Sequence, residues 1–113
     1  MIRSSFTALL GLIAVSALTP QMALAAEDHV AEAITHTQEA IDHGKQGHAD
    51  VLATHAEAAL THANAAEKEK ANPHTKQGIA HLEMAIAEGK KKDAAAGAKH
   101  AEEALTHLQA ATK

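Results

Sequence analysis

The chain has 113 residues, a formal net charge of −4 and no cysteine, and Phe6 is its only Phe, Tyr or Trp. The lack of cysteine excludes disulfides, thiolate metal sites and a cysteine nucleophile. The acidic balance and the near absence of aromatic rings argue against nucleic-acid binding. This length supports one small domain.

Residues 1–25 are predicted to be a secretory signal peptide. A basic residue, Arg3, precedes an apolar run over 6–18, and Ala23-Leu24-Ala25 is a typical cleavage site. The apolar run is short for a membrane span, although an uncleaved N-terminal anchor is the alternative. We therefore expect an exported mature chain, residues 26–113, that is periplasmic and has 14 acidic residues against nine lysines.

The first predicted helix begins after Asp28 as N-cap and ends before Gly44 as the C′ residue. The second runs from about residue 49 to residue 70. Apolar residues at helical spacing form one seam on each helix and predict the core face. The seams are Val30, Ile34, Thr37 and Ile41 on the first helix, and Leu52, Ala56, Leu60 and Ala63 on the second.

The third predicted helix follows Asn72 as N-cap and Pro73 at its first position, and ends at Gly89. The fourth begins near Asp93. Alanine occupies many of the remaining helical positions, and it favours helix but buries little area per residue. We therefore expect a marginal core with about 3–5 kcal/mol of net stability.

The mature chain contains an internal repeat with an offset of 45 residues. Residues 29–68 align without gaps on 74–113, with 19 of 40 positions identical. Each half reads as helix, turn and helix. The expected fold is all-α, an antiparallel up-down four-helix bundle of two tandem hairpins in one His-rich domain over 26–113, with repeat one at 29–73 and repeat two at 74–113.

Ten histidines recur in steps of seven, which is close to two helical turns, so they form stripes on the helix faces. In the first half their residue numbers pair to a constant sum of 91, and in the second half to 181, as expected for residues at equal heights in an antiparallel hairpin. Glu88 and Asp93 replace the third pair of the second half. The histidines are His29, His36, His43, His48, His55, His62, His74, His81, His100 and His107.

The sequence alone does not fix the side of each hairpin on which the histidines lie. They are about 130° from the seam centre of the first helix and about 105° from that of the second, on the same rotational side. The two stripes of a hairpin therefore either converge in one groove or diverge together. Their matched heights favour convergence.

Histidines seven apart on one helix are about 10.5 Å apart and cannot share an ion, so a chelate needs a second helix or a nearer donor. Imidazole and carboxylate donors suit divalent transition metals, with Cu²⁺ favoured over Ni²⁺ and Zn²⁺. All ten histidines are candidate ligands. His29 and His74, at the helix starts, are expected to contribute least. The further donors whose role stays open are Glu32, Glu39, Met84, Glu88, Asp93 and Glu103. Among these donors, Glu32, Glu39 and Glu103 lie within one turn of a histidine on the same helix, and we interpret them mainly as helix partners of that histidine.

The segments HADVLATHAEAALTH (48–62), HAEEALTHL (100–108) and the turn HGKQGH (43–48) resemble the small metal-binding protein family of the Gram-negative periplasm. The likeness covers residues 27–113. The resemblance implies periplasmic binding of several divalent ions, chiefly Cu²⁺, for storage, buffering or resistance, with the ten histidines as ligands. The chain departs from this pattern at Glu88 and Asp93.

The sequence shows no catalytic constellation, so we expect a binding protein and not an enzyme. The expected partners are metal ions, without nucleic acid or a membrane in the mature form, and the chain is expected to be a monomer. Two alternatives belong to other classes. One is a pH-responsive helical interaction protein, because protonating ten histidines would reverse the charge. The other is a periplasmic adaptor or chaperone.

Overall fold

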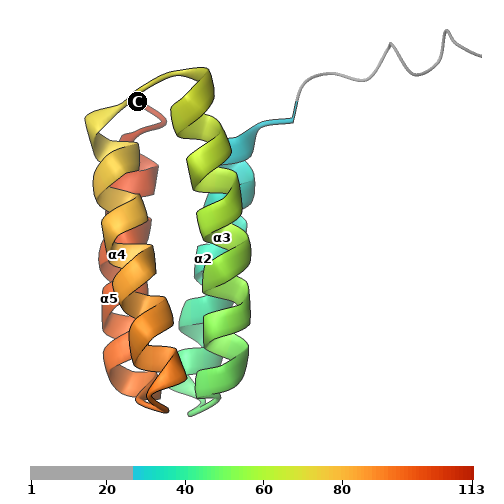
Figure 1. Cartoon of the computed structure of the whole chain (residues 1–113), viewed down its shortest axis with the longest axis vertical. Coiled ribbons are helices and arrows are strands. Elements are labelled where there is room, and N and C mark those ends of the chain that lie inside the picture. The colour runs from blue at the N-terminus through green and yellow to red at the C-terminus, as the bar shows by residue number, and fades with distance from the viewer. Residues whose placement is uncertain (1–26) are drawn as a thin grey trace, which may run out of the picture.

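The computed structural model describes residues 27–113, and this part of the chain forms four helices without a strand (Figure 1). The predicted signal peptide, residues 1–25, lies outside the described residues. None of the four helices is apolar over a stretch long enough to cross a membrane. The helices are α2 (His29–Lys45), α3 (Ala49–Glu69), α4 (Pro73–Lys90) and α5 (Ala94–Ala110).

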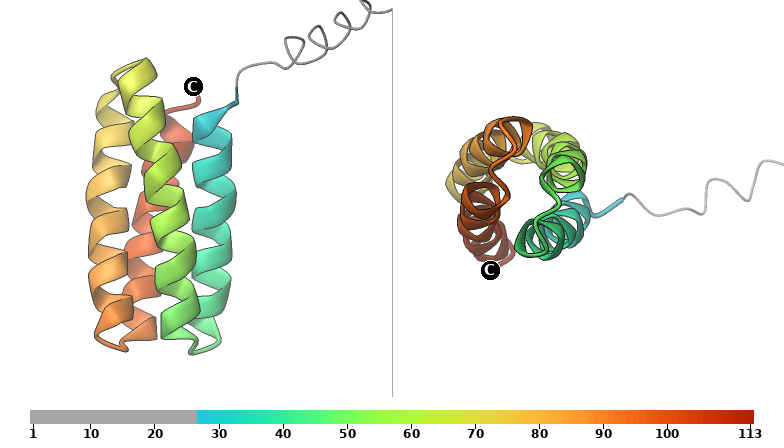
Figure 2. Two further views of the ribbon diagram at one scale, coloured as in Figure 1. Left: turned by 45° about the vertical axis from the view of Figure 1, so that its right-hand side comes forward. Right: turned by 90° about the horizontal axis from the view of Figure 1, so that it is seen from below.

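The four helices form an antiparallel up-down bundle of two hairpins, as the repeat predicts. Helix α2 packs along α3, and α4 packs along α5. The hairpins then join through α3 against α4 and α2 against α5, which closes the ring of helices in the end-on view (Figure 2). Both hairpin turns lie at one end of the bundle, and the connection from α3 to α4 lies at the other (Figure 1).

Side-chain caps fix the start of three helices. Asp28 accepts a hydrogen bond from the amide of Ala31, and Asn72 accepts one from His74. Asp93 does the same for the amide of Ala96. These caps confirm the predicted helix starts, since each satisfies an amide that has no partner within the helix. The N-cap of α3 is His48, which makes no such bond.

The centre of the core is built mainly from alanine, and the larger residues flank it. Most of the predicted seam is buried, but Val30, Ile34 and Leu60 are only partly covered. Small central side chains let the helix axes approach closely, although they bury little apolar area. The only large hydrophobic side chains that are fully buried within 27–113 are Leu52, Leu82 and Leu108.

Two glycines have a different role from the one that the sequence indicates. The prediction that Gly44 follows the end of the first helix is wrong, because α2 continues to Lys45 and Gly44 is buried within it. A Cβ atom at Gly44 would lie 2.5 Å from Cδ1 of Leu52. Gly89 is likewise inside α4, which ends one residue later than predicted. These glycines therefore allow close packing between helices.

In each turn, the residue with a left-handed backbone conformation lies three residues after the buried glycine. Gly47 has φ of 82°, and its repeat counterpart Lys92 has φ of 69°. In both turns the residue that follows donates its amide to the carbonyl five residues earlier, over 2.9 Å. The two turns thus share one backbone geometry, although only the first uses glycine where glycine is favoured.

Candidate metal centres

The histidine stripes of α2 and α3 converge, as their matched heights predict. The six rings form one zigzag row in which neighbouring ring centroids are 5.3–6.0 Å apart. Rings from α2 and α3 alternate along it. The order along the row is His29, His62, His36, His55, His43 and His48. Each pair that the sequence places at one height is in contact.

The hairpin of α4 and α5 has a shorter row of the same kind. His74, His107, His81 and His100 follow one another with centroid separations of 6.1, 5.5 and 6.1 Å. The convergence of the stripes is thus the same in both halves, and five ring pairs lie at matched heights. The row ends where the sequence has carboxylates in place of the last two rings.

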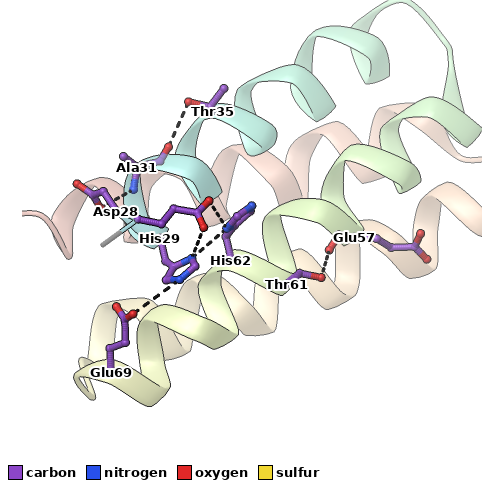
Figure 3. A network of polar contacts seen from close by, with 9 residues as sticks. Asp28, His29, Ala31, Thr35, Glu57, Thr61, His62 and Glu69 are labelled. Carbon is purple, nitrogen blue, oxygen red and sulfur yellow. Dashed lines mark hydrogen bonds and ion pairs between the residues drawn. The ribbon is translucent and has the colours of Figure 1, made fainter. Parts of the chain in front are cut away.

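Two of the pairs bring ring nitrogens together directly. The Nδ1 atoms of His29 and His62 are 3.1 Å apart, and those of His43 and His48 are 3.4 Å apart. Figure 3 shows His29 and His62 turned toward each other across α2 and α3. The carboxylate of Glu69 lies 3.7 Å from Nε2 of the same His29 ring (Figure 3).

In the pair of His36 and His55, and in its repeat counterpart, one carboxylate contacts the rings of both helices. Nδ1 of His36 and Nδ1 of His55 each lie 3.1 Å from the same Oε1 atom of Glu39. In the second hairpin, Nδ1 of His81 and Nδ1 of His100 each lie 3.3 Å from Oε1 of Glu103. Each group offers two nitrogens and one oxygen that converge on one point.

The structure gives these glutamates more than the helix-partner role that their spacing indicates. Glu39 is three residues after His36, and that contact is within one helix, but His55 belongs to the facing helix. Glu103 relates to His100 and His81 in the same way. Sequence spacing alone reveals only the first contact of each glutamate.

Two further groups lie toward the open end of the first hairpin. Glu27 is 3.6 Å from Nδ1 of His62 and 3.9 Å from that of His29, so the three form one group. Glu32, His36 and His62 form another. Glu27 is not among the donors predicted from the sequence, because it precedes the first helix, and His29, which the sequence predicts to contribute least, lies in this group. The signal for both was a carboxylate two residues before a histidine.

The remaining candidates are not gathered into groups of three donors. His74 is exposed, and its ring lies only near that of His107. Met84 is 44% exposed. The Asp93 carboxylate caps α5, and Glu88 pairs with Lys91 over 3.6 Å. The matched height of Glu88 and Asp93 therefore does not produce a sixth pair.

The donor distances fit a bound transition-metal ion. A metal–imidazole bond is about 2.0–2.1 Å long, so two donors on one tetrahedral or square-planar ion are about 2.8–3.4 Å apart. The nitrogen–nitrogen and nitrogen–oxygen distances of 3.1–3.4 Å given above fall in this range, whereas the distances of 3.6 and 3.9 Å from Glu27 are longer. The donor set, imidazole with carboxylate, is also one that divalent late transition metals accept.

Residues 4–111 match the family model described as small metal-binding protein. The chain belongs to the small metal-binding protein family. A search of curated proteins gave no match. Membership in this family and the grouped His and Glu side chains both indicate that the chain binds metal ions.

Proposed function

We propose that this member of the family is an exported, non-enzymatic protein of the periplasm that binds several divalent ions, chiefly Cu²⁺, for storage, buffering or resistance. Ni²⁺ and Zn²⁺ are the weaker alternatives in the usual order of affinity. The ten histidines are the proposed ligands. The single observation that carries the proposal is the meeting of imidazoles from facing helices at matched heights.

The arrangement supports several ions at once. Three groups share no residue: Glu27 with His29 and His62, His36 with Glu39 and His55, and His81 with His100 and Glu103. The group of Glu32, His36 and His62 overlaps two of these and competes with them. Two histidine pairs without a third donor remain, and water would complete their coordination. We therefore expect three tighter ions and up to two weaker ones.

The test is a titration of residues 26–113 with Cu²⁺ at pH 7, followed by calorimetry and native mass spectrometry. The matched variant replaces His48, His55 and His62 by Gln, which leaves the whole stripe of α2 intact. If ions lie between helices, this variant loses every ion of the first hairpin and keeps those of the second. Binding of the full number of ions by the variant, or no binding by the parent chain, would contradict the proposal.

The alternatives make different predictions in the same titration. A pH-responsive interaction protein would give no heat with Cu²⁺ and would bind an acidic partner or lipid only near pH 5. An adaptor or chaperone needs an apolar surface, and among the large hydrophobic residues described only Val51 and Met84 are exposed. The structure therefore offers less support for an adaptor than for a metal-binding protein.

A further inference from the structure

We propose that the group of His81, His100 and Glu103 is the first to bind a metal ion, ahead of its counterpart His36, His55 and Glu39. This inference rests on the proposed function, and it assigns an order of filling to the proposed sites. The two groups form a matched pair, so their differences can be compared residue by residue.

The two groups have equivalent histidines but carboxylates from opposite helices. His81 and His100 are the repeat counterparts of His36 and His55. The counterpart of Glu39 is Met84, which brings no carboxylate to the second group, and the second carboxylate comes from α5. An antiparallel helix pair has a local twofold axis, and that axis relates the two carboxylate positions. The two groups therefore have the same kinds of donor, but the carboxylate comes from the first helix of one hairpin and from the second helix of the other.

The nitrogens of the second group are buried and lack hydrogen bonds. The Nδ1 atoms of His81 and His100 are shielded from solvent and have no hydrogen-bond partner, although both lie 3.3 Å from Oε1 of Glu103. If Nδ1 carries the proton, no acceptor lies at a suitable angle. If it does not, its lone pair faces a carboxylate oxygen. A cation between the three atoms would satisfy both nitrogens, and buried polar atoms are rarely left unpaired.

One nitrogen of the first group already has a hydrogen-bond partner. Nδ1 of His36 is hydrogen-bonded to Glu39, so an ion must displace that bond. His36 also belongs, with Glu32 and His62, to a second, competing group, whereas the stacking of its ring between two others is shared by His81. Binding to the first group therefore breaks a hydrogen bond that the second group does not have.

The exposure of the two glutamates permits a balanced experiment. The Glu39 side chain is 46% exposed and that of Glu103 is 50% exposed, so neither Glu39→Gln nor Glu103→Gln should disturb the fold. Circular dichroism checks this. Each substitution keeps the shape of the side chain and removes one charged oxygen donor.

Competition titrations of the unmodified chain and of each variant, with Cu²⁺ and a chelator of known affinity, measure the tightest dissociation constant. We expect Glu103→Gln to weaken the first-filled site about tenfold or more, a typical loss for a perturbed metal site, so that the tightest dissociation constant rises toward that of the next site. Glu39→Gln should leave the first binding step as it is and weaken a later one. In NMR spectra, the first equivalent of Cu²⁺ should broaden the ring signals of His81 and His100 before those of His36 and His55.

An equal effect of the two substitutions, a larger effect of Glu39→Gln, no effect of either, or broadening that begins at His36 and His55 would overturn the order of filling. These outcomes leave the proposed function intact, because copper is still bound. A failure of the unmodified chain to bind Cu²⁺ would overturn both proposals, and the two failures are thus distinguishable.

Discussion

Eight of the ten histidine side chains lie at the flank of the core and are partly exposed, and only His48 and His74 are fully on the surface. The side chains of His29, His36 and His55 are 20–28% exposed, and those of His81 and His100 are similar. Contact with a facing ring restricts each side chain, which lowers the entropy lost when an ion is bound. Partial exposure leaves a path for ions to enter and leave, as the proposed storage or buffering role requires.

The most demanding packing position is Leu52. Its side chain is fully buried, and Cβ atoms built at Gly44, Gly89 and Gly97 would all come within 2.5–3.1 Å of its Cδ atoms. Leu52 therefore fills a space that three glycines from α2, α4 and α5 leave open. One residue thus joins all four helices.

Leu52→Ala should lower the free energy of unfolding by about 2–5 kcal/mol, because it leaves a cavity between the glycines. In a core of this size that loss is enough to unfold much of the protein. The neighbouring Val51 is 38% exposed and serves as the control, and Val51→Ala should change the value by less than about 0.5 kcal/mol. Urea denaturation without metal measures both. Equal losses would show that Leu52 has no special place in the core.

Lys92 adopts the left-handed conformation that Gly47 adopts in the other turn. A side chain there costs about 1–2 kcal/mol, and the ion pair of Lys92 with Asp50 is exposed and contributes little. Lys92→Gly should therefore raise the free energy of unfolding by up to about 1 kcal/mol, and Gly47→Ala should lower it. Thermal melting of the two variants checks both signs, and a fall in stability for Lys92→Gly would contradict the account.

At the scale of helices, the sequence predicts the number, direction and starts of the elements well, because caps and spacing are local signals. It also predicts which histidines pair, since the antiparallel direction fixes their heights. It leaves open the side on which the stripes lie, because offsets of about 130° and 105° allow both solutions. That choice depends on how the two hairpins pack. The packing role of Gly44 is hidden for the same reason, since its partner Leu52 lies on another helix.

The missing sixth pair is a difference between the turns of the two hairpins. His43 and His48 flank the first turn, and Glu88 and Asp93 occupy the same backbone positions in the second. The carboxylate of Asp93 accepts a hydrogen bond from Ala96, whereas His48 caps nothing. The second hairpin therefore has a capped helix where the first has an imidazole.

The double substitution Glu88→His and Asp93→His should restore the pair and add one bound Cu²⁺ ion, which native mass spectrometry would count. The same protein should be less stable without metal by about 0.5–2 kcal/mol, the usual value of an N-cap. Asp93→His alone is the control, because it loses the cap without completing a pair. An unchanged ion count in the double variant would show that matched height is insufficient for binding.

In the whole molecule, the two hairpins are complementary and not interchangeable. Leu52 of the first hairpin packs against Gly97 of the second, its own repeat counterpart, whereas Leu108 packs against Gly78 within the second hairpin. Three ion pairs join the hairpins, Lys45 with Glu102, Lys90 with Glu57 and Lys92 with Asp50, and all are exposed and contribute little stability. The histidine rows lie within hairpins, so each hairpin should bind its ions independently of the other.

Cu²⁺ at pH 7 should raise the melting temperature by at least about 5 °C, because ions that bridge two helices bind the folded state in preference to the unfolded one. The increase should shrink as the pH falls toward 6 and below, since coordination requires neutral imidazole. Differential scanning calorimetry at several pH values measures this. A melting temperature that saturating Cu²⁺ leaves unchanged would contradict bridging between helices.

The proposed ions lie between imidazoles of facing helices, and their positions can be measured. Crystals of residues 26–113 grown with Cu²⁺ and measured at the copper absorption edge locate the ions directly. We expect anomalous peaks between His36 and His55 and between His81 and His100, with each peak within about 2.0–2.2 Å of nitrogens from both helices. Peaks bound to one helix only, or no peaks along the histidine rows, would contradict the proposal.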